Sequence, residues 1–309
     1  MLEANFQKNY LVVIVGPTAV GKTELTVNLA KQFDAEVLNA DSRQIYKELS
    51  IGTARPTPEE MDNVTHYFTG ILSLSENYNA GKFEKDALEI LHKIYEDKNI
   101  AFLSGGSGLY IDAVCKGFDE LPAVSPEIRT TLENEWKNNG LENLVNELKQ
   151  KDAEYAEQVD LHNPHRIIRA LEIIRSTGKT YSSFRQSNLK TRPFKTIKVG
   201  LNREREELYN RINLRMDNML EAGLVEEARE YIQFRDCNAL QTVGYKEIYE
   251  YFDGKYDWDE AVRLLKRNTR RFAKRQMTWF RRDNEINWFH PSQEKEISQY
   301  IKESIEKDN

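Results

Sequence analysis

The residues best suited to chemistry lie in one segment near the amino terminus, which reads GPTAVGKT. The segment matches the phosphate-loop pattern G-x-x-x-x-G-K-[S/T], and it lies between a strand-like run and a helical pattern, as that motif requires. Glycines let backbone amides point at phosphate oxygens, and the start of the helix adds partial positive charge. Lys22 adds a full charge, and the Thr23 hydroxyl can bind Mg²⁺. The predicted phosphate-binding residues are Gly16, Pro17, Thr18, Ala19, Val20, Gly21, Lys22 and Thr23.

The acid that usually completes such a site in an ATPase is missing from its expected place. An ATPase usually ends a second strand in an aspartate that orders Mg²⁺ and water. Here the run IAFLS continues into glycines, whereas another run, AEVLNAD, ends in Asp41. Three roles for Asp41 stay open: a Mg²⁺ ligand, a cap of the next turn, and a general base. Ser42, Arg43 and Gln44 follow it with side chains suited to hydrogen bonding.

Two other short stretches carry weaker signals. GGSGLY, residues 105–110, is a second glycine-rich turn between a strand and a helix, where glycine often serves close packing instead of binding. GTARP, residues 52–56, is typical of a surface loop. The five histidines show no metal-ligand spacing with acids or thiols. The two cysteines lie far apart, which suits buried thiols in a reducing cytoplasm.

The net charge of −6 conceals two basic windows. Residues 165–198 contain nine Lys or Arg and one acid, and residues 263–282 contain nine Lys or Arg and no acid. Such segregation favours a polyanionic partner over two solvated helix faces. In the first window, Arg166 and Arg169 lie three apart, opposite an apolar set. The second window interleaves arginines with aromatic residues, which could stack on bases but for the most part are expected in the core.

A further pair of arginines lies between these windows. Arg211 and Arg215 are four residues apart on a predicted helix, so both can point into a site or into water.

The elements that must position these residues alternate between strand and helix in the first third of the chain. YLVVIV is typical of a buried parallel strand. We expect a helix over 22–33, a strand over 35–41, a helix from Phe83, and a strand over 100–104 that a short helix follows. This alternation predicts an α/β fold with a parallel sheet.

The middle of the chain has a different character, because residues 118–195 show short helical patterns and no convincing strand. The clearest pattern is HNPHRIIRALEIIRSTG, with Asn163 as the amino-terminal cap, Pro164 in the first turn and Gly178 past the end.

The last third begins with the strand-like run TIKVGL and is then helical, with helices expected over 202–221, up to about 235, and over 261–280. We therefore predict an α/β core with a parallel sheet, formed by residues 1–117 and 198–309, and an all-helical insertion over residues 118–197. No apolar run is long enough to cross a membrane, and the amino terminus lacks the pattern of a signal peptide.

Taken together, the motifs resemble those of the tRNA dimethylallyltransferases. The resembling stretches occur in order and span nearly the whole chain: GPTAVGKT, DSRQIY, GTARP, GGSGLY, NPHRIIRALE, RINLRMDNMLEAGLVEE, LQTVGYKE and TRRFAKRQMTWFR. Many families share the first, whereas DSRQIY followed by GTARP, NPHRIIRALE and KRQMTWFR is more specific. Ser107 departs from the family, which more often has threonine there, but keeps the hydroxyl. No carboxy-terminal zinc finger of the eukaryotic kind is present, which indicates a bacterial-type enzyme.

The resemblance implies a P-loop NTPase-like core whose loop holds the diphosphate of dimethylallyl diphosphate instead of ATP. The acceptor is the 6-amino nitrogen of adenine at tRNA position 37, and the products are isopentenyladenosine and diphosphate. Asp41 is the implied general base, while Lys22, Thr23 with Mg²⁺, and Arg215 stabilise the diphosphate. A closed channel through the core would admit the prenyl donor at one end and the flipped adenine at the other.

The implied partner is the anticodon stem-loop, bound by a monomeric cytoplasmic enzyme that contacts no membrane. The tRNA-binding residues that the resemblance implies are Asp41, Ser42, Arg43, Gln44, Ser107, His165, Arg166, Arg169, Lys274 and Arg275.

Three alternatives stay open. An isopentenyltransferase acting on free adenine nucleotides would share the chemistry, but it would need neither the insertion nor the basic windows. A small-metabolite kinase would use ATP at the same loop, and the missing Mg²⁺-ordering acid disfavours it. A non-catalytic RNA-binding ATPase module would explain the basic windows but not Asp41.

Overall fold

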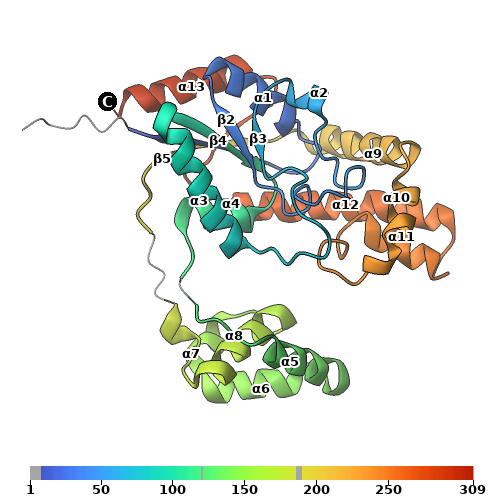
Figure 1. The fold of residues 1–309 in the computed structure, drawn as a ribbon. Helices are drawn as coiled ribbons and strands as arrows, with labels where there is room; N and C mark the ends of the chain where they lie inside the picture. Colours follow the sequence, from blue (N-terminus) through green and yellow to red (C-terminus); the bar gives the residue numbers. More distant parts are fainter. Residues whose placement is uncertain (1–7, 120, 186–189, 309) are drawn as a thin grey trace, which may run out of the picture. The chain divides into compact units, whose positions relative to one another are not determined.

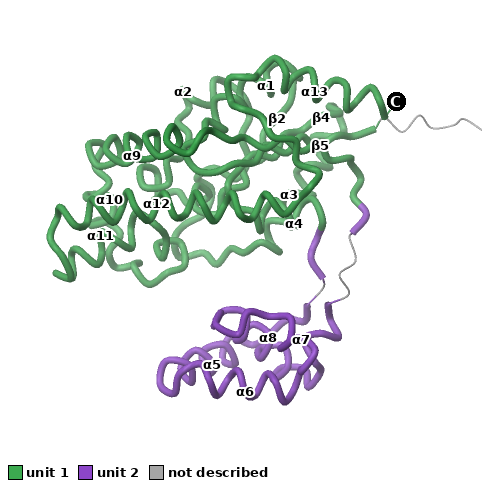
Figure 2. Tube along the Cα trace, turned by 180° about the vertical axis from the view of Figure 1, so that it is seen from behind, with its two compact units in different colours: residues 1–116, 192–309 green, residues 117–191 purple. Residues whose placement is uncertain are grey.

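The computed structural model describes residues 8–119, 121–185 and 190–308. The chain separates into two compact units, coloured differently in Figure 2. Unit 1 joins Met1–Lys116 to Arg192–Asn309, and unit 2 is Gly117–Thr191.

Unit 1 is built on a six-stranded sheet in which all paired strands are parallel, as the alternation of patterns predicted. The strand order is β3-β2-β4-β1-β5-β6. Every residue of β1 is buried, because a parallel strand in the middle of a sheet is covered on both faces. The strands are β1 (Tyr10–Val15), β2 (Glu36–Asn39), β3 (His66–Tyr67), β4 (Ile100–Gly105), β5 (Lys195–Leu201) and β6 (Asn287–Phe289).

The register brings the candidate site residues to one edge of this sheet. Val15 pairs with Gly105, and Asn39 pairs with Ser104, so β1, β2 and β4 end side by side. The phosphate loop, the DSRQ stretch and the second glycine-rich turn follow these three strands. Parallel strands place their carboxyl ends at the same edge, which is where open α/β sheets bind ligands.

Helices cover both faces of the sheet (Figure 1). Val12 and Ile14 belong to a core shared with Leu29 of α1 and Ile297 of α13, whereas α4 and α12 approach β1 from its other face. The helices of unit 1 are α1 (Lys22–Gln32), α2 (Pro58–Met61), α3 (Ala80–Asp97), α4 (Gly108–Lys116), α9 (Arg205–Glu221), α10 (Leu224–Glu230), α11 (Tyr245–Phe252), α12 (Trp258–Phe280) and α13 (Glu294–Glu306), with a 3-10 turn, η2 (Ile232–Phe234).

Some boundaries differ from the predicted ones because caps lie outside the apolar pattern. Helix α3 begins at Ala80, since the Asn79 side chain accepts hydrogen bonds from the next amides, and α12 begins at Trp258 behind the Asp257 cap. Strands β3 and β6 and helices α2, α11 and α13 were not predicted. The two strands have two and three residues and leave little periodic signal.

Unit 2 is helical, with no strand among its described residues. It has its own apolar core, to which Leu132, Leu148, Ile167 and Leu171 contribute. Helix α8 has the caps that its sequence predicts: Asn163 Oδ1 accepts from the Arg166 amide at 3.3 Å, and Gly178 has φ 72°. The elements of unit 2 are α5 (Pro126–Asn139), α6 (Glu142–Lys151), α7 (Ala153–Gln158), α8 (Pro164–Thr177) and η1 (Ser182–Phe184).

The predicted insertion, 118–197, extends too far at its carboxyl end. Strand β5 begins at Lys195 and pairs with β1 from that residue onward, so residues 192–197 belong to unit 1. None of the helices in the described part of the chain is both long and apolar enough to cross a membrane.

Candidate active site

The phosphate loop connects β1 to α1 in a conformation that depends on glycine. Gly16 and Gly21 have φ of 154° and 107°, in the region that L side chains rarely adopt. A Cβ on Gly16 would lie 2.7 Å from the Leu201 carbonyl oxygen. Gly21 is the cap of α1 and has no side chain to satisfy the first amides of that helix. These amides therefore remain available to an anion.

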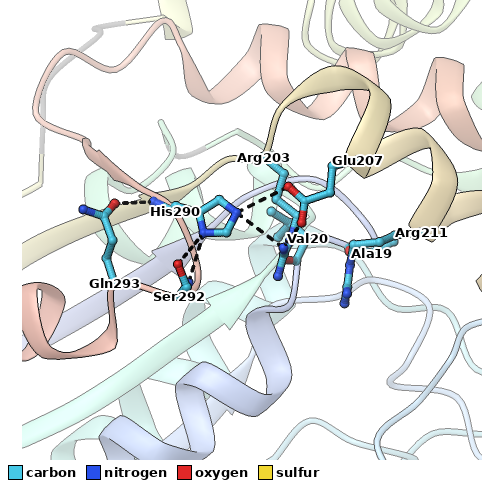
Figure 3. A network of polar contacts seen from close by, with 8 residues as sticks. All are labelled: Ala19, Val20, Arg203, Glu207, Arg211, His290, Ser292 and Gln293. Carbon is cyan, nitrogen blue, oxygen red and sulfur yellow. Dashed lines mark hydrogen bonds and ion pairs between the residues drawn. The ribbon is translucent and has the colours of Figure 1, made fainter.

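Two arginines hold the outer side of this loop (Figure 3). Arg211 Nε donates to the Ala19 carbonyl at 2.9 Å, and Arg203 Nε donates to the Val20 carbonyl at 2.8 Å. Within a trans peptide unit, the N–H points opposite to the C=O. The N–H groups of Val20 and Gly21 consequently point away from the two arginines. The sequence marked Arg211 only as the neighbour of Arg215, and it gave no signal for Arg203.

Arg203 is itself held by a small polar network. Its guanidinium forms an ion pair with Glu207, which also lies 3.4 Å from His290 Nε2. The pKa of Glu207 is lowered: burial raises it, but hydrogen bonds from Arg203 and His290 outweigh that effect. His290 follows β6, and its backbone N–H donates to Gln293 Oε1 at 2.8 Å. The unpredicted end of the chain therefore supports the phosphate loop.

Lys22 folds back onto its own loop, where Nζ donates to the Gly16 carbonyl at 2.9 Å and to the Pro17 carbonyl at 2.8 Å. The pKa of Lys22 is lowered to about 8. Burial is the main cause, Asp41 opposes the shift, and Arg215 adds to it. When a phosphate binds, the Lys22 ammonium can exchange its hydrogen bonds to these two neutral carbonyls for bonds to phosphate oxygens.

Arg215 joins the same cluster from α9. Its Nη2 donates to the Ala54 carbonyl in the GTARP loop at 3.3 Å. Burial lowers the pKa of Arg215, while Asp41 acts in the opposite direction. The three residues assigned to catalysis on different segments, Lys22, Asp41 and Arg215, thus influence one another electrostatically.

Asp41 acts as a cap, which is one of the roles left open by its sequence. Its Oδ1 accepts hydrogen bonds from the backbone amides of Arg43 at 2.9 Å and Gln44 at 3.3 Å. Its Oδ2 has no hydrogen-bond donor among the residues that the structure describes, so the cap leaves one oxygen for a proton or a cation. The Gln44 side chain donates to the carbonyls of Thr53 and Ala54, both at 3.0 Å.

The second glycine-rich turn lies against Asp41's loop. Ser107 Oγ accepts from the Ser42 amide at 2.9 Å and lies 3.2 Å from the Ser42 hydroxyl. A Cβ on Gly105 would lie 2.1 Å from the Ala40 carbonyl oxygen. These glycines therefore serve close packing, as glycines in such turns often do.

Gln276 of α12 connects the two glycine-rich turns, a role the sequence did not reveal. Its Oε1 accepts from the Thr18 amide at 2.9 Å, and its Nε2 donates to the Gly106 carbonyl at 3.0 Å. The only signal was its place in the KRQMTWFR stretch.

Glu227 is another residue that sequence reasoning missed. This buried carboxylate on α10 accepts from the amides of Ser50, Ile51 and Gly52 at 2.8–2.9 Å, and from the Tyr245 hydroxyl. It therefore anchors the loop that presents Ala54 to Arg215. Glu227 and Tyr245 both lie in stretches that carried the resemblance.

The first basic window is less positive in the structure than in the sequence. His165 and Arg166 are exposed on α8, whereas Arg169 pairs with the buried Glu172 at 2.9 Å. Several other cations of the window pair with acids from distant parts of the chain. These pairs are Arg175 with Glu135 and Glu147, Arg192 with Glu84, Lys195 with Asp308, and Lys198 with Asp283 and Glu285. A count of charges within residues 165–198 cannot include these acids, because all of them lie outside that range.

The second window lies on α12, where Lys274 and Arg275 are exposed. The prediction that most of its aromatic residues lie in the core holds for Phe280, whereas Phe272 and Trp279 are half-buried. Phe280 is buried, and Trp279 Nε1 donates to Asp112 Oδ2 at 2.9 Å.

A cavity of about 200 Å³ lies beneath α12, on the α4 side of β1. None of the predicted site residues lines it, so it is not the predicted channel for donor and adenine. Cys115 in its wall is half-buried, as is Cys237, although both were predicted to be buried, and burial raises the pKa of the Cys115 thiol to about 12. The lining residues are Val13, Val15, Ile111, Asp112, Cys115, Lys116, Lys198, Trp279, Phe280, Arg282, Asp283 and Ile286.

Mg²⁺ prefers oxygen ligands and keeps several waters, so one or two protein oxygens beside a phosphate suffice. Within the described ranges, no three His, Cys, Asp or Glu side chains gather as a metal site. The exposed Thr23 hydroxyl at the start of α1 fits the smaller requirement of a phosphate-bound Mg²⁺.

Comparisons with known proteins identify the family of this chain. A family model described as IPP transferase matches residues 44–283. A tRNA dimethylallyltransferase of Cytophaga hutchinsonii is 52% identical over 302 residues, which cover 98% of this chain and 99% of that relative.

Solved structures give the same result. The full-length tRNA isopentenylpyrophosphate transferase of Bacillus halodurans has a TM-score of 0.73 and 39% identity, and the match covers 97% of this chain and 98% of that one. A eukaryotic dimethylallyltransferase acting on tRNA has a TM-score of 0.75 and 26% identity, over 88% of this chain and 70% of that one. With a family model across most of its length and a relative of this identity, the chain belongs to the tRNA dimethylallyltransferases, a family of prenyltransferases.

Proposed function

We propose that this chain transfers the dimethylallyl group of dimethylallyl diphosphate to the 6-amino nitrogen of adenine at tRNA position 37, as a monomer in the cytoplasm. The observation that carries the proposal is the cluster of Lys22, Arg215 and Asp41 at the carboxyl edge of the sheet. Two cations there suit a departing diphosphate, and a carboxylate oxygen beside them suits the proton of an attacking amine.

The donor half of the site stabilises the leaving group. As the carbon–oxygen bond breaks, allylic cation character develops on carbon and negative charge develops on the diphosphate. Lys22, Arg215 and the amides at the start of α1 would stabilise that charge. When bound through Thr23, Mg²⁺ would supply further positive charge to the same oxygens.

The acceptor half of the site removes a proton. The adenine amine is a weak nucleophile, so its nitrogen–carbon bond forms as the carbon–oxygen bond breaks. The nitrogen then carries an extra proton, which passes to Asp41 Oδ2 as general base. The other oxygen, Oδ1, stays bonded to the amides of Arg43 and Gln44 and holds the carboxylate in place.

The acceptor RNA would be held by two groups of residues. Ser42, Arg43 and Ser107 are suited to read the base and its neighbours, whereas the Gln44 side chain holds the carbonyls of Thr53 and Ala54. Cations of α8 and α12 would bind the phosphates of the anticodon stem-loop, so binding should weaken steeply with salt. The residues of this group are the exposed His165, Arg166, Lys274 and Arg275, and the half-buried Arg169, which also pairs with Glu172.

A double substitution, Arg166→Ala with Arg169→Ala, tests the RNA face. It should raise the KM for tRNA and reduce the slope of log affinity against log salt by about 1 to 2, because Arg166 is exposed whereas Arg169 also pairs with Glu172. Lys85→Ala with Lys93→Ala removes two exposed cations from α3 and serves as the control. Equal slopes for the two double variants would place the RNA elsewhere.

A label-transfer assay tests the reaction. Labelled dimethylallyl diphosphate is incubated with enzyme, Mg²⁺ and, in parallel, unmodified tRNA, an anticodon stem-loop, AMP or ATP. Label should appear in both RNAs and in neither nucleotide. Label in AMP or ATP alone would contradict the proposed acceptor, and ATP hydrolysis without transfer would contradict the proposed use of the loop.

Asp41→Asn separates the roles of Asp41 in the same assay. The amide keeps an oxygen acceptor for the capping bonds but cannot act as the base, so turnover should fall about a hundredfold or more while tRNA affinity is retained. Asp41→Ala should lose at least as much turnover. Normal turnover in Asp41→Asn would leave Asp41 as a cap only.

A further inference from the structure

The inference concerns Gln276, whose side chain lies between the two glycine-rich turns. The residue is 7% exposed, and both ends of its carboxamide are bonded: Oε1 to the Thr18 amide at 2.9 Å and Nε2 to the Gly106 carbonyl at 3.0 Å. The orientation of the carboxamide follows from its partners. A backbone N–H can only donate and a carbonyl can only accept, so Oε1 must face the phosphate loop.

The position of Gln276 is fixed by the close packing of α12 against the second glycine-rich turn. A Cβ on Gly106 would lie 2.3 Å from Gln276 Nε2, and a Cβ on Gly108 would lie 2.3 Å from Trp279 Cδ1. Both glycines therefore let α12 approach the second turn closely. The bond from Trp279 to Asp112 then ties α12 to α4.

This contact removes one donor from the phosphate loop. The Thr18 N–H already donates to Gln276 Oε1, so this neutral oxygen lies where a phosphate oxygen would otherwise accept that hydrogen bond. In loops of this pattern, the helix end holds the inner phosphates and the lysine reaches the outer ones. Lys22 Nζ lies against the carbonyls of Gly16 and Pro17, so an outer phosphate would approach the part of the loop that Gln276 covers.

We propose that Gln276 determines the ligand specificity of this loop by admitting a diphosphate and rejecting a triphosphate. Two phosphates can use Lys22 and the amides at the start of α1. A third phosphate would meet Gln276 Oε1 and would lack the Thr18 donor. The proposal rests on the proposed function, in which the loop holds the diphosphate of the prenyl donor.

Inorganic diphosphate and inorganic tripolyphosphate, each used as a competitor of the prenyl donor, test the proposal. The readout is the ratio of the inhibition constant of tripolyphosphate to that of diphosphate. In Gln276→Ala the ratio should fall about tenfold or more, because the Thr18 N–H becomes free to bind an anionic oxygen and the covering oxygen is gone. In Gln276→Glu the ratio should stay high or rise, because a carboxylate repels the third phosphate. A merely structural role does not predict opposite directions.

Two controls keep the result interpretable. Met277→Ala removes a neighbouring buried side chain of α12 and should leave the ratio unchanged. Gln276→Met nearly keeps the volume without an acceptor, so it should lower the ratio even if Gln276→Ala fails to fold. One ratio for all variants, or an equal fall in Met277→Ala, would overturn the role of Gln276. If neither anion competes with the donor in the unaltered enzyme, the proposed use of the loop fails as well.

A double-mutant cycle adds an independent check. Gly106→Ala pushes a methyl group against Gln276 and should lower the ratio by itself. In the Gln276→Ala background the same methyl group meets no carboxamide, so its further effect should be small. Additive effects of the two substitutions would contradict the coupling that the proposal requires.

Discussion

The two glycine-rich turns of this protein follow neighbouring parallel strands, and each precedes a helix, yet they use glycine for different purposes. In the first turn, Gly16 and Gly21 adopt positive φ, and the amides that open α1 have no cap. In the second, Gly105 and Gly108 make room for Ala40 and Trp279, which would lie 2.1–2.3 Å from an added Cβ. The first turn is open to a ligand, whereas neighbouring elements of the protein fill the second. Glycine spacing alone does not distinguish these cases, because both conformational freedom and close approach select the same residue.

The largest effect expected from this contrast is the loss of the phosphate-loop charge. Lys22→Met should lower kcat/KM about a thousandfold, the upper range for one lost donor to a developing anion. Ser107→Ala in the second turn should cost only a few-fold, because its hydroxyl accepts a backbone hydrogen bond from Ser42. Steady-state kinetics with dimethylallyl diphosphate and tRNA measure both. Similar losses would mean that the second turn also contacts reacting groups.

The next effect is on stability. Gly105→Ala should lower the free energy of unfolding by about 3 kcal/mol, because the methyl group would overlap the backbone of Ala40 and push β2 and β4 apart. Urea denaturation measures the change. An unaltered midpoint would show that the strand ends move apart easily and that packing does not explain this glycine.

Donor binding should depend on pH through Lys22 of the first glycine-rich turn, because the second turn has no side chain that titrates between pH 7 and 9.5. Burial lowers the pKa of Lys22 to about 8, and a bound diphosphate favours the charged amine, so binding takes up a proton above that pH. Near pH 7, Lys22 is mostly charged, so the dissociation constant for diphosphate should change little with pH. Above pH 8, Lys22 loses its proton, and the dissociation constant should rise up to tenfold per pH unit. Titration calorimetry between pH 7 and 9.5 measures it. In Lys22→Arg, whose side chain stays charged, the rise should disappear, and its persistence would assign the titration to another group.

The smallest effect is the strain of a single left-handed residue. Gly21→Ala places a side chain at φ 107° with no atom closer than 3.5 Å, so it should cost about 1 kcal/mol of stability and raise the KM for the donor several-fold. Gly178→Ala at φ 72° past the end of α8 is the matched control. It should cost similar stability and leave the donor KM unchanged. A rise in donor KM in both variants would point to a general loss of folded enzyme.

Much of the core was predictable because its signals are local. The run YLVVIV, the loop after it and the caps of α8 are each specified by adjacent residues, and the structure has them where the sequence placed them. Beyond this, the assignment of Asp41, Lys22 and Arg215 to one site depended on resemblance. Nothing in the spacing of the three segments says that they meet.

The remaining contacts depend on residues that are distant in sequence. Gln276 lies 258 positions from Thr18, and Glu227 lies 175 positions from Gly52. Arg192 belongs to the first basic window in the sequence, but in the structure it forms an ion pair with Glu84, which is also distant in sequence. No local period or charge count reports such pairs, because they form only when separate elements pack.

The amino-acid sequence by itself therefore determined the parallel sheet, the phosphate loop and the helical character of unit 2, since hydrophobic periodicity, glycine and capping residues act over a few neighbouring positions. The tertiary structure alone decided which glycine-rich turn stays open, which cations remain unneutralised and which side chain covers Thr18. Those outcomes depend on how closely α12 and α9 approach the carboxyl ends of the strands, and that approach is set by the packing of the whole core.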